Sequence, residues 1–161
     1  MQPIRDAHIV RLIEQISEHY RTNIYNQYIR PALLQMPLDK ATWDLIDILA
    51  EKVEQFRYQG FHLDELYRQI AACARFVSVV RRDLVPGLRS RSSIPAVTGP
   101  NKVLRDMAIN NFASNLQVFA DLINELYVKL VEMDKMDAKG HMPLYVQMPE
   151  LKDVGRQLIG G

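Results

Sequence analysis

The chain has 161 residues, and 48% of them are hydrophobic, which is enough to fill the core of one domain. Lys and Arg total 20 against 19 Asp and Glu, so the net charge of +1 gives no overall field that would attract nucleic acid or a membrane. The single cysteine, Cys73, excludes an intrachain disulfide and fits a reducing compartment. The N-terminal residues lack a signal-peptide pattern, and no stretch approaches the roughly 20 apolar residues of a membrane span. We therefore expect a cytoplasmic protein without membrane insertion.

Apolar residues recur at helical spacing over most of the chain, which predicts an all-α fold. The first helix is predicted over about residues 3–30, because Pro3 suits a first helical turn and Pro31 interrupts the pattern. Residues 31–37 are then either a kinked continuation of this helix or an apolar connector.

Two shorter helices are predicted in the middle of the chain. One covers about residues 39–58 and begins after Asp39, a favourable N-cap residue. The other covers about residues 64–85, where Pro86 and Gly87 should end it. Its predicted buried seam has apolar residues at alternating intervals of three and four: Leu63, Leu66, Ile70, Cys73, Val77, Val80 and Leu84.

The longest helix is predicted over about residues 101–138, because its apolar residues keep an unbroken heptad register. These are Ile109, Phe112, Leu116, Phe119, Ile123, Leu126, Leu130 and Met133. With the other three helices it predicts a four-helix bundle in a single domain over 1–161. At about 1.5 Å per residue this helix is roughly 55 Å long and its two predecessors are nearer 30 Å. The surplus length leads us to expect a homodimer.

Two segments lack a helical pattern. Residues 86–100 form a long connector, and connectors of this length are commonly functional or disordered. The apolar tail that follows His141 is expected to dock on the bundle, with a short helix over about 149–158.

No catalytic constellation is found in the sequence. No glutamate is followed three residues later by a histidine, the arrangement that would build a dinuclear metal centre in a bundle. Cys73 occupies a core position, where a thiol serves as a small apolar residue. Glycine-rich phosphate loops and nucleophile elbows are also absent. We therefore predict no catalytic residues, no metal site and no cofactor, and lean towards a non-enzymatic protein.

Basic residues gather around the 86–100 connector. If the connector folds back, they meet near the N-terminus of the long helix, where backbone donors also favour an anion. The alternative is that they balance a helix dipole or are simply solvated. The candidate ligands of an anion are Arg81, Arg82, Arg89, Arg91, Lys102 and Arg105.

Aromatic and asparagine residues supply candidate interface positions. Tyr25, Tyr28 and Trp43 form either an interface hot spot or a core whose polar tips reach hydrogen-bond partners. Asn115 flanks the heptad seam, where an asparagine can set register or bond across an interface.

These observations favour a non-enzymatic scaffold or adaptor that acts through protein–protein contacts and self-associates. The alternative is a regulatory domain that binds phosphate, a nucleotide or a lipid headgroup at the arginine cluster. No nucleic-acid partner is expected, because no aromatic residue lies among these basic residues.

Overall fold

The computed structural model describes residues 4–31, 39–57, 62–90, 102–151 and 154. Before residue 91 the described residues form three helical runs, and each run continues from an α-helix into a segment with a different helical pitch. They are α1 (Ala7–His19) with the π-helix η1 (Tyr20–Ile29), α3 (Lys40–Glu54) with the 3-10 turn η2 (Gln55–Arg57), and α4 (Leu63–Val79) with the π-helix η3 (Val80–Leu84) and α5 (Val85–Ser90). The remainder forms α7 (Lys102–Asp137), α8 (Leu144–Gln147) and the 3-10 turn η4 (Pro149–Leu151).

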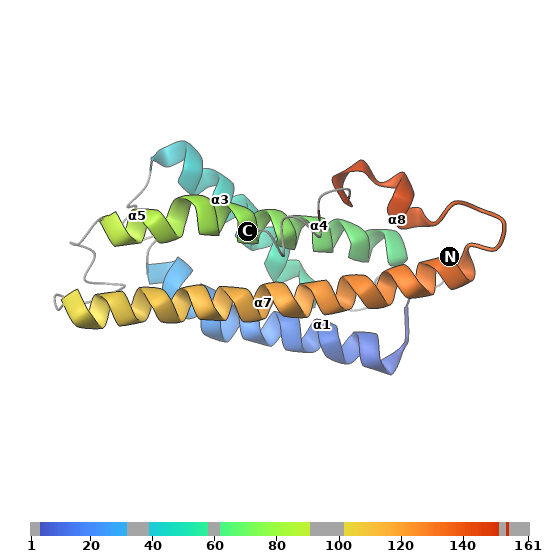
Figure 1. The fold of residues 1–161 in the computed structure, drawn as a ribbon, viewed down its shortest axis with the longest axis horizontal. Helices are drawn as coiled ribbons and strands as arrows, with labels where there is room; N and C mark the ends of the chain where they lie inside the picture. The colour runs from blue at the N-terminus through green and yellow to red at the C-terminus, as the bar shows by residue number, and fades with distance from the viewer. Residues whose placement is uncertain (1–3, 32–38, 58–61, 91–101, 152–153, 155–161) are drawn as a thin grey trace.

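The helices α1, α4 and α7 lie side by side along the long axis of the molecule, and α3 crosses them obliquely (Figure 1). The long helix α7 contacts α1 on one side and α4 on the other, and α4 also packs on α3. The predicted all-α bundle is confirmed, and no strand occurs in the described residues. Within this part of the chain, no helix has the length and apolarity that a membrane span requires.

The core is built from the apolar seams that the sequence predicts. All seven seam residues of the third helical run are at most 7% exposed, and Cys73 among them is completely buried. On α7 the seam is buried from Ile109 to Leu130, whereas Met133 is only half-buried. Heptad spacing puts these residues on one face of each helix, so the two seams meet inside the bundle.

Two helices begin after a capping aspartate. The cap at Asp39 is the predicted one, whereas the first helix begins at Ala7 and not near Pro3. The Asp6 carboxylate accepts hydrogen bonds from the backbone N–H groups of His8 and Ile9, at 2.9 and 3.2 Å. At α3 the Asp39 carboxylate accepts from the backbone and hydroxyl of Thr42, and these bonds lower the pKa of Asp39.

The prediction that Pro86 and Gly87 end the third helix is wrong, because helix α5 continues to Ser90. Proline lacks a donor, and its ring clashes with the carbonyl four residues back in an α-helix. Here the preceding turn is a π turn, in which the Val85 N–H bonds back to the Val80 carbonyl. The wider turn relieves the crowding, and the predicted 86–100 connector therefore begins with helix. Residues 91–100 lie outside the described part.

The tail docks on the bundle as predicted, but its local structure differs. Gly140, with φ of 76°, adopts the left-handed conformation open to glycine just beyond α7. The helix after it is α8, which was not predicted, and a 3-10 turn occupies the start of the predicted 149–158 helix. Residues 152–153 and 155–158 of the predicted helix lie outside the described part. The docking side chains Met148, Leu151 and Val154 are buried.

The length mismatch that suggested a homodimer is largely removed. Together α4, η3 and α5 form a run over 63–90, longer than the predicted 64–85 helix, and α8 packs near the far end of α7. One chain therefore supplies cover for α7 along most of its inner face, and length alone no longer argues for a second subunit.

Candidate interaction surfaces

A polar network joins η1 to α7. His19 Nε2 lies 2.9 Å from the Asn115 carbonyl oxygen, and His19 Nδ1 lies 2.9 Å from the Asn23 side-chain nitrogen. Asn115 in turn donates from its side chain to the Asn23 carbonyl at 3.4 Å. Because a carbonyl oxygen can only accept, His19 donates to Asn115 from Nε2. Asn115 thus bonds between two helices of the same chain.

The aromatic residues predicted as interface positions lie inside this chain. Trp43 is 1% exposed and Tyr28 is 5% exposed. Tyr28 stacks on Phe112, with ring centroids 4.5 Å apart, and its hydroxyl accepts a hydrogen bond from Asn111. Tyr25 is half-buried beside Tyr20. Tyr28 and Trp43 therefore lie in the core of this chain and not on its surface. The Tyr28 hydroxyl reaches a hydrogen-bond partner, whereas the buried Trp43 Nε1 has none among the described residues.

Of the six residues in the predicted arginine cluster, the structure describes the side chains of two, so the cluster stays a prediction. Arg81 turns towards α7 and donates to the Gln117 side chain, and partial burial lowers the pKa of Arg81. Arg82 points to solvent and pairs with Asp83 at 3.1 Å, which raises the pKa of Arg82. Arg91 and the side chains of Arg89, Lys102 and Arg105 lie outside the described part.

A buried carboxylate fastens the tail to the bundle. Asp134 is 4% exposed, and its Oδ2 accepts from the Tyr67 hydroxyl at 3.1 Å and from the Tyr145 backbone N–H at 2.9 Å. Burial, together with the negative charge of Asp134, raises the pKa of Tyr67, so Tyr67 stays a neutral donor. This clamp joins α4, α7 and α8. The heptad pattern did not predict it, because position 134 adjoins the seam rather than belonging to it.

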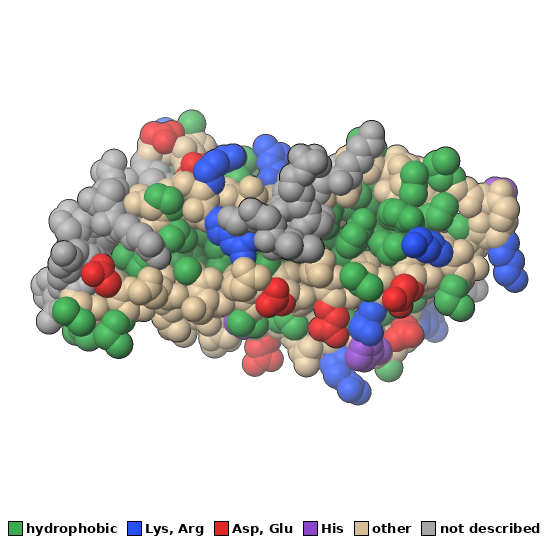
Figure 2. All heavy atoms as spheres, viewed as in Figure 1, with side chains coloured by type: hydrophobic (Ala, Val, Ile, Leu, Met, Phe, Trp, Pro, Cys, Tyr) green, Lys and Arg blue, Asp and Glu red, His purple; other side chains and the backbone are tan. Residues whose placement is uncertain are grey.

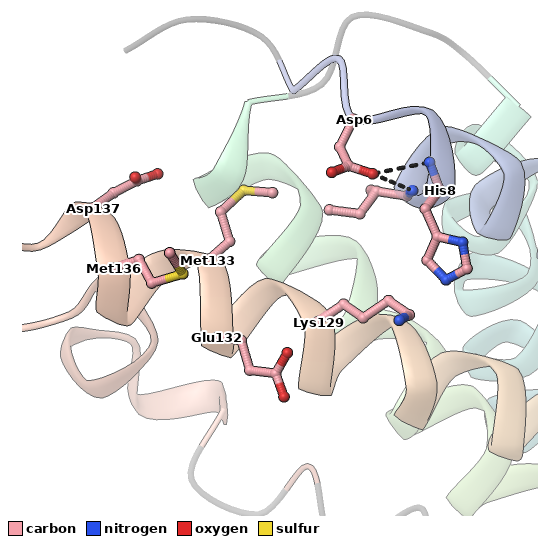
Figure 3. A pocket seen from close by; sticks show the side chains of 8 residues that line it. Asp6, His8, Lys129, Glu132, Met133, Met136 and Asp137 are labelled. Atoms are coloured by element: carbon pink, nitrogen blue, oxygen red, sulfur yellow. Dashed lines mark hydrogen bonds between the residues drawn. The ribbon is translucent and has the colours of Figure 1, made fainter.

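A pocket of about 330 Å³ lies between the start of α1 and the last turns of α7 (Figure 3). Its lining mixes acids, bases and thioethers: Asp6, His8, Ile9, Lys129, Glu132, Met133, Met136 and Asp137. Figure 3 shows the Asp6 carboxylate directed at the first turn of α1, which it caps. Across the described residues, no group of three or more His, Cys, Asp or Glu could hold a metal ion. The described residues that line the pocket therefore include no such metal-binding group.

The outer side of α7 changes character along its length. Residues 107–120 contain no Asp, Glu, Lys, Arg or His, although this stretch is helical throughout. Large apolar side chains are exposed here: Met107 is 62% and Val118 46% exposed. With the exposed Asn110, Asn111 and Ser114 they form what we call the charge-free face. In the sequence this face is marked by the absence of charged residues from 107–120, a signal that charged or aromatic clusters do not reveal.

Comparison with protein-family models, curated proteins and solved structures finds no match for this chain.

Proposed function

We propose that this chain is a non-enzymatic helical-bundle adaptor that binds another protein through the charge-free face of α7. The observation that carries the proposal is the exposure of Met107 and Val118 on a stretch of helix without a charged residue. Scattered exposed apolar residues are ordinary, but contiguous ones on an uncharged helical face are typical of interaction sites.

The composition of the face suits a protein partner. The buried centres of protein–protein contacts are depleted of charged residues and enriched in methionine. Binding at the charge-free face would remove apolar surface from water without desolvating a charge. The amides of Asn110 and Asn111 supply uncharged hydrogen-bonding groups, and Asn111 is already oriented by its bond to Tyr28.

The helix beneath the face is anchored firmly enough to present it. Phe112, Leu116 and Phe119 on the opposite side of the same turns are fully buried. A rigid surface loses little conformational entropy when a partner binds.

The test introduces charge into the face without touching the core. A Met107→Glu/Val118→Glu variant and a matched Val128→Glu/Met136→Glu control, from the other half of α7, are used to capture proteins from cells that express the chain. We expect a partner retained by the wild type and the control but lost by the first variant. Equal capture by both variants would contradict the proposal.

A further inference from the structure

The α4–α7 pair carries opposite charges on its two helices. Residues 66–82 contain four arginines and no acid, whereas residues 106–128 contain three acids and neither Lys nor Arg. In the central part of the face drawn in Figure 2, basic side chains lie towards α4 and acidic side chains lie along α7. Four of these charged side chains are exposed: Arg68, Arg75, Asp121 and Glu125.

Internal packing fixes which of these charges lie level with one another. The rings of Tyr67 and Tyr127 lie 6.3 Å apart, as do those of Phe76 and Phe119. The two helices run in opposite directions (Figure 1). Moving one residue forward along α4 therefore reaches the level of one residue further back along α7. Arg75 is therefore level with residue 120, beside Asp121.

The same rule places Arg68 level with residue 126, beside Glu125. Yet the described side chains of this chain do not pair them across the two helices. Arg68 bonds to Asp64 at 3.4 Å, and Asp121 accepts from Gln117 at 2.8 Å. Within the described residues Arg75 and Glu125 form no ion pair.

We propose that this face, the α4–α7 charge face, binds a second copy of the chain. A two-fold axis parallel to the two helices exchanges α4 and α7 without shifting their levels. Arg75 of each copy then faces Asp121 of the partner subunit, and Arg68 faces Glu125 of the partner subunit. The same surface serves both copies, as two-fold symmetry requires.

The surface is suited to a helix rather than to a membrane. Residues between the arginines on α4 are small, notably Ala72 and Ser78, so a partner helix can approach closely. None of the large exposed apolar residues among those described lies on α4, so a bilayer would find nothing to bury there.

Contacts between exposed charges are weak and screened by salt. The dimer should therefore form at high protein concentration and low ionic strength and weaken as salt is added. The charge-free face adjoins this surface, because Val118 lies one turn before Asp121 on the same side of α7. Met107 lies several turns away from Asp121, so a substitution there tests the two proposals separately.

Sedimentation equilibrium of four samples tests the dimer. The samples are the wild type, the Arg68→Glu/Arg75→Glu variant, the Asp121→Arg/Glu125→Arg variant, and an equimolar mixture of the two variants. Each variant alone places like charges opposite one another, and we expect its dissociation constant to rise at least about tenfold. In the mixture both halves of the interface again pair opposite charges, so a heterodimer should form.

Circular dichroism confirms that the variants fold, and Met107→Glu serves as the control that should dimerise normally. A wild type that stays monomeric at a protein concentration of about 1 mM and low ionic strength would overturn the proposal. So would a dimer that survives both charge reversals. A chain that is monomeric by itself but binds an acidic helical peptide through Arg75 would overturn the second copy as occupant.

Discussion

The two halves of α7 share one buried seam but present different surfaces. Each half exposes two large apolar side chains, Met107 and Val118 in the first and Val128 and Met136 in the second. The residues from 107 to 120 carry no charge, whereas acids and lysines lie among the residues from Asp121 to Asp137. Inside, Phe112 and Leu116 in the first half are as fully buried as Leu126 and Leu130 in the second. The difference therefore does not arise from the needs of the core.

Each half is also tied to the bundle by a polar contact of its own. In the first half, Asn115 and His19 form a network between half-buried side chains. In the second half, the buried carboxylate of Asp134 holds Tyr67 and the tail. A network of uncharged amide and carbonyl groups thus holds α7 to the first helical run, whereas a carboxylate holds α7 to α4 and the tail.

Truncation of buried residues should have the largest effect, and it tests whether the cores of the two halves of α7 contribute equally to stability. Phe112→Ala should lower the free energy of unfolding by about 3–5 kcal/mol, and Leu126→Ala by about 2–5 kcal/mol, because both remove fully buried side chains. Urea denaturation measures both values. A loss below about 1 kcal/mol for Phe112→Ala would mean that the first half is poorly anchored.

The next effect distinguishes the two polar anchors. Asp134→Ala leaves two buried donors without their acceptor and should cost about 2–3 kcal/mol, with faster amide exchange at Tyr145. His19→Ala breaks contacts between half-buried groups and should cost about 1 kcal/mol. Urea denaturation with hydrogen exchange reports both. Equal costs would remove the distinction between the charged and the neutral anchor.

The smallest effect appears at alkaline pH. Because burial raises the pKa of Tyr67, the unfolded chain releases its phenolic proton first, and folded-state stability falls as the pH rises above the ordinary value of 10.0. At neutral pH Tyr67→Phe should be less stable by about 1 kcal/mol, since one hydrogen bond is lost. Above pH 10 the difference should narrow. Parallel stability curves would show that Tyr67 ionises as easily in the folded chain.

Much of the fold could be predicted from the sequence because it depends on local periodicity. The α4 and α7 seams and the N-cap at Asp39 follow from spacing and residue type alone. The continuation past Pro86 could not be predicted, since it requires a π turn whose wider pitch has no distinct pattern in the sequence.

The candidate surfaces were predicted less well. Whether Trp43 and Tyr28 face a partner or the core depends on which helices pack together, and single-chain periodicity does not specify this. The level of Arg75 beside Asp121 likewise follows only from ring contacts between α4 and α7. The uncharged stretch 107–120, in contrast, was readable from the sequence itself.

Because Cys73 is completely buried, chemical modification of its thiol reports unfolding of the chain. Burial raises the pKa of the thiol, so little of the reactive thiolate exists in the folded protein and reagents cannot reach it. Labelling therefore requires α4 to leave the core. Because Cys73 is the sole cysteine, the rate of its modification measures how often the bundle opens, without an engineered probe.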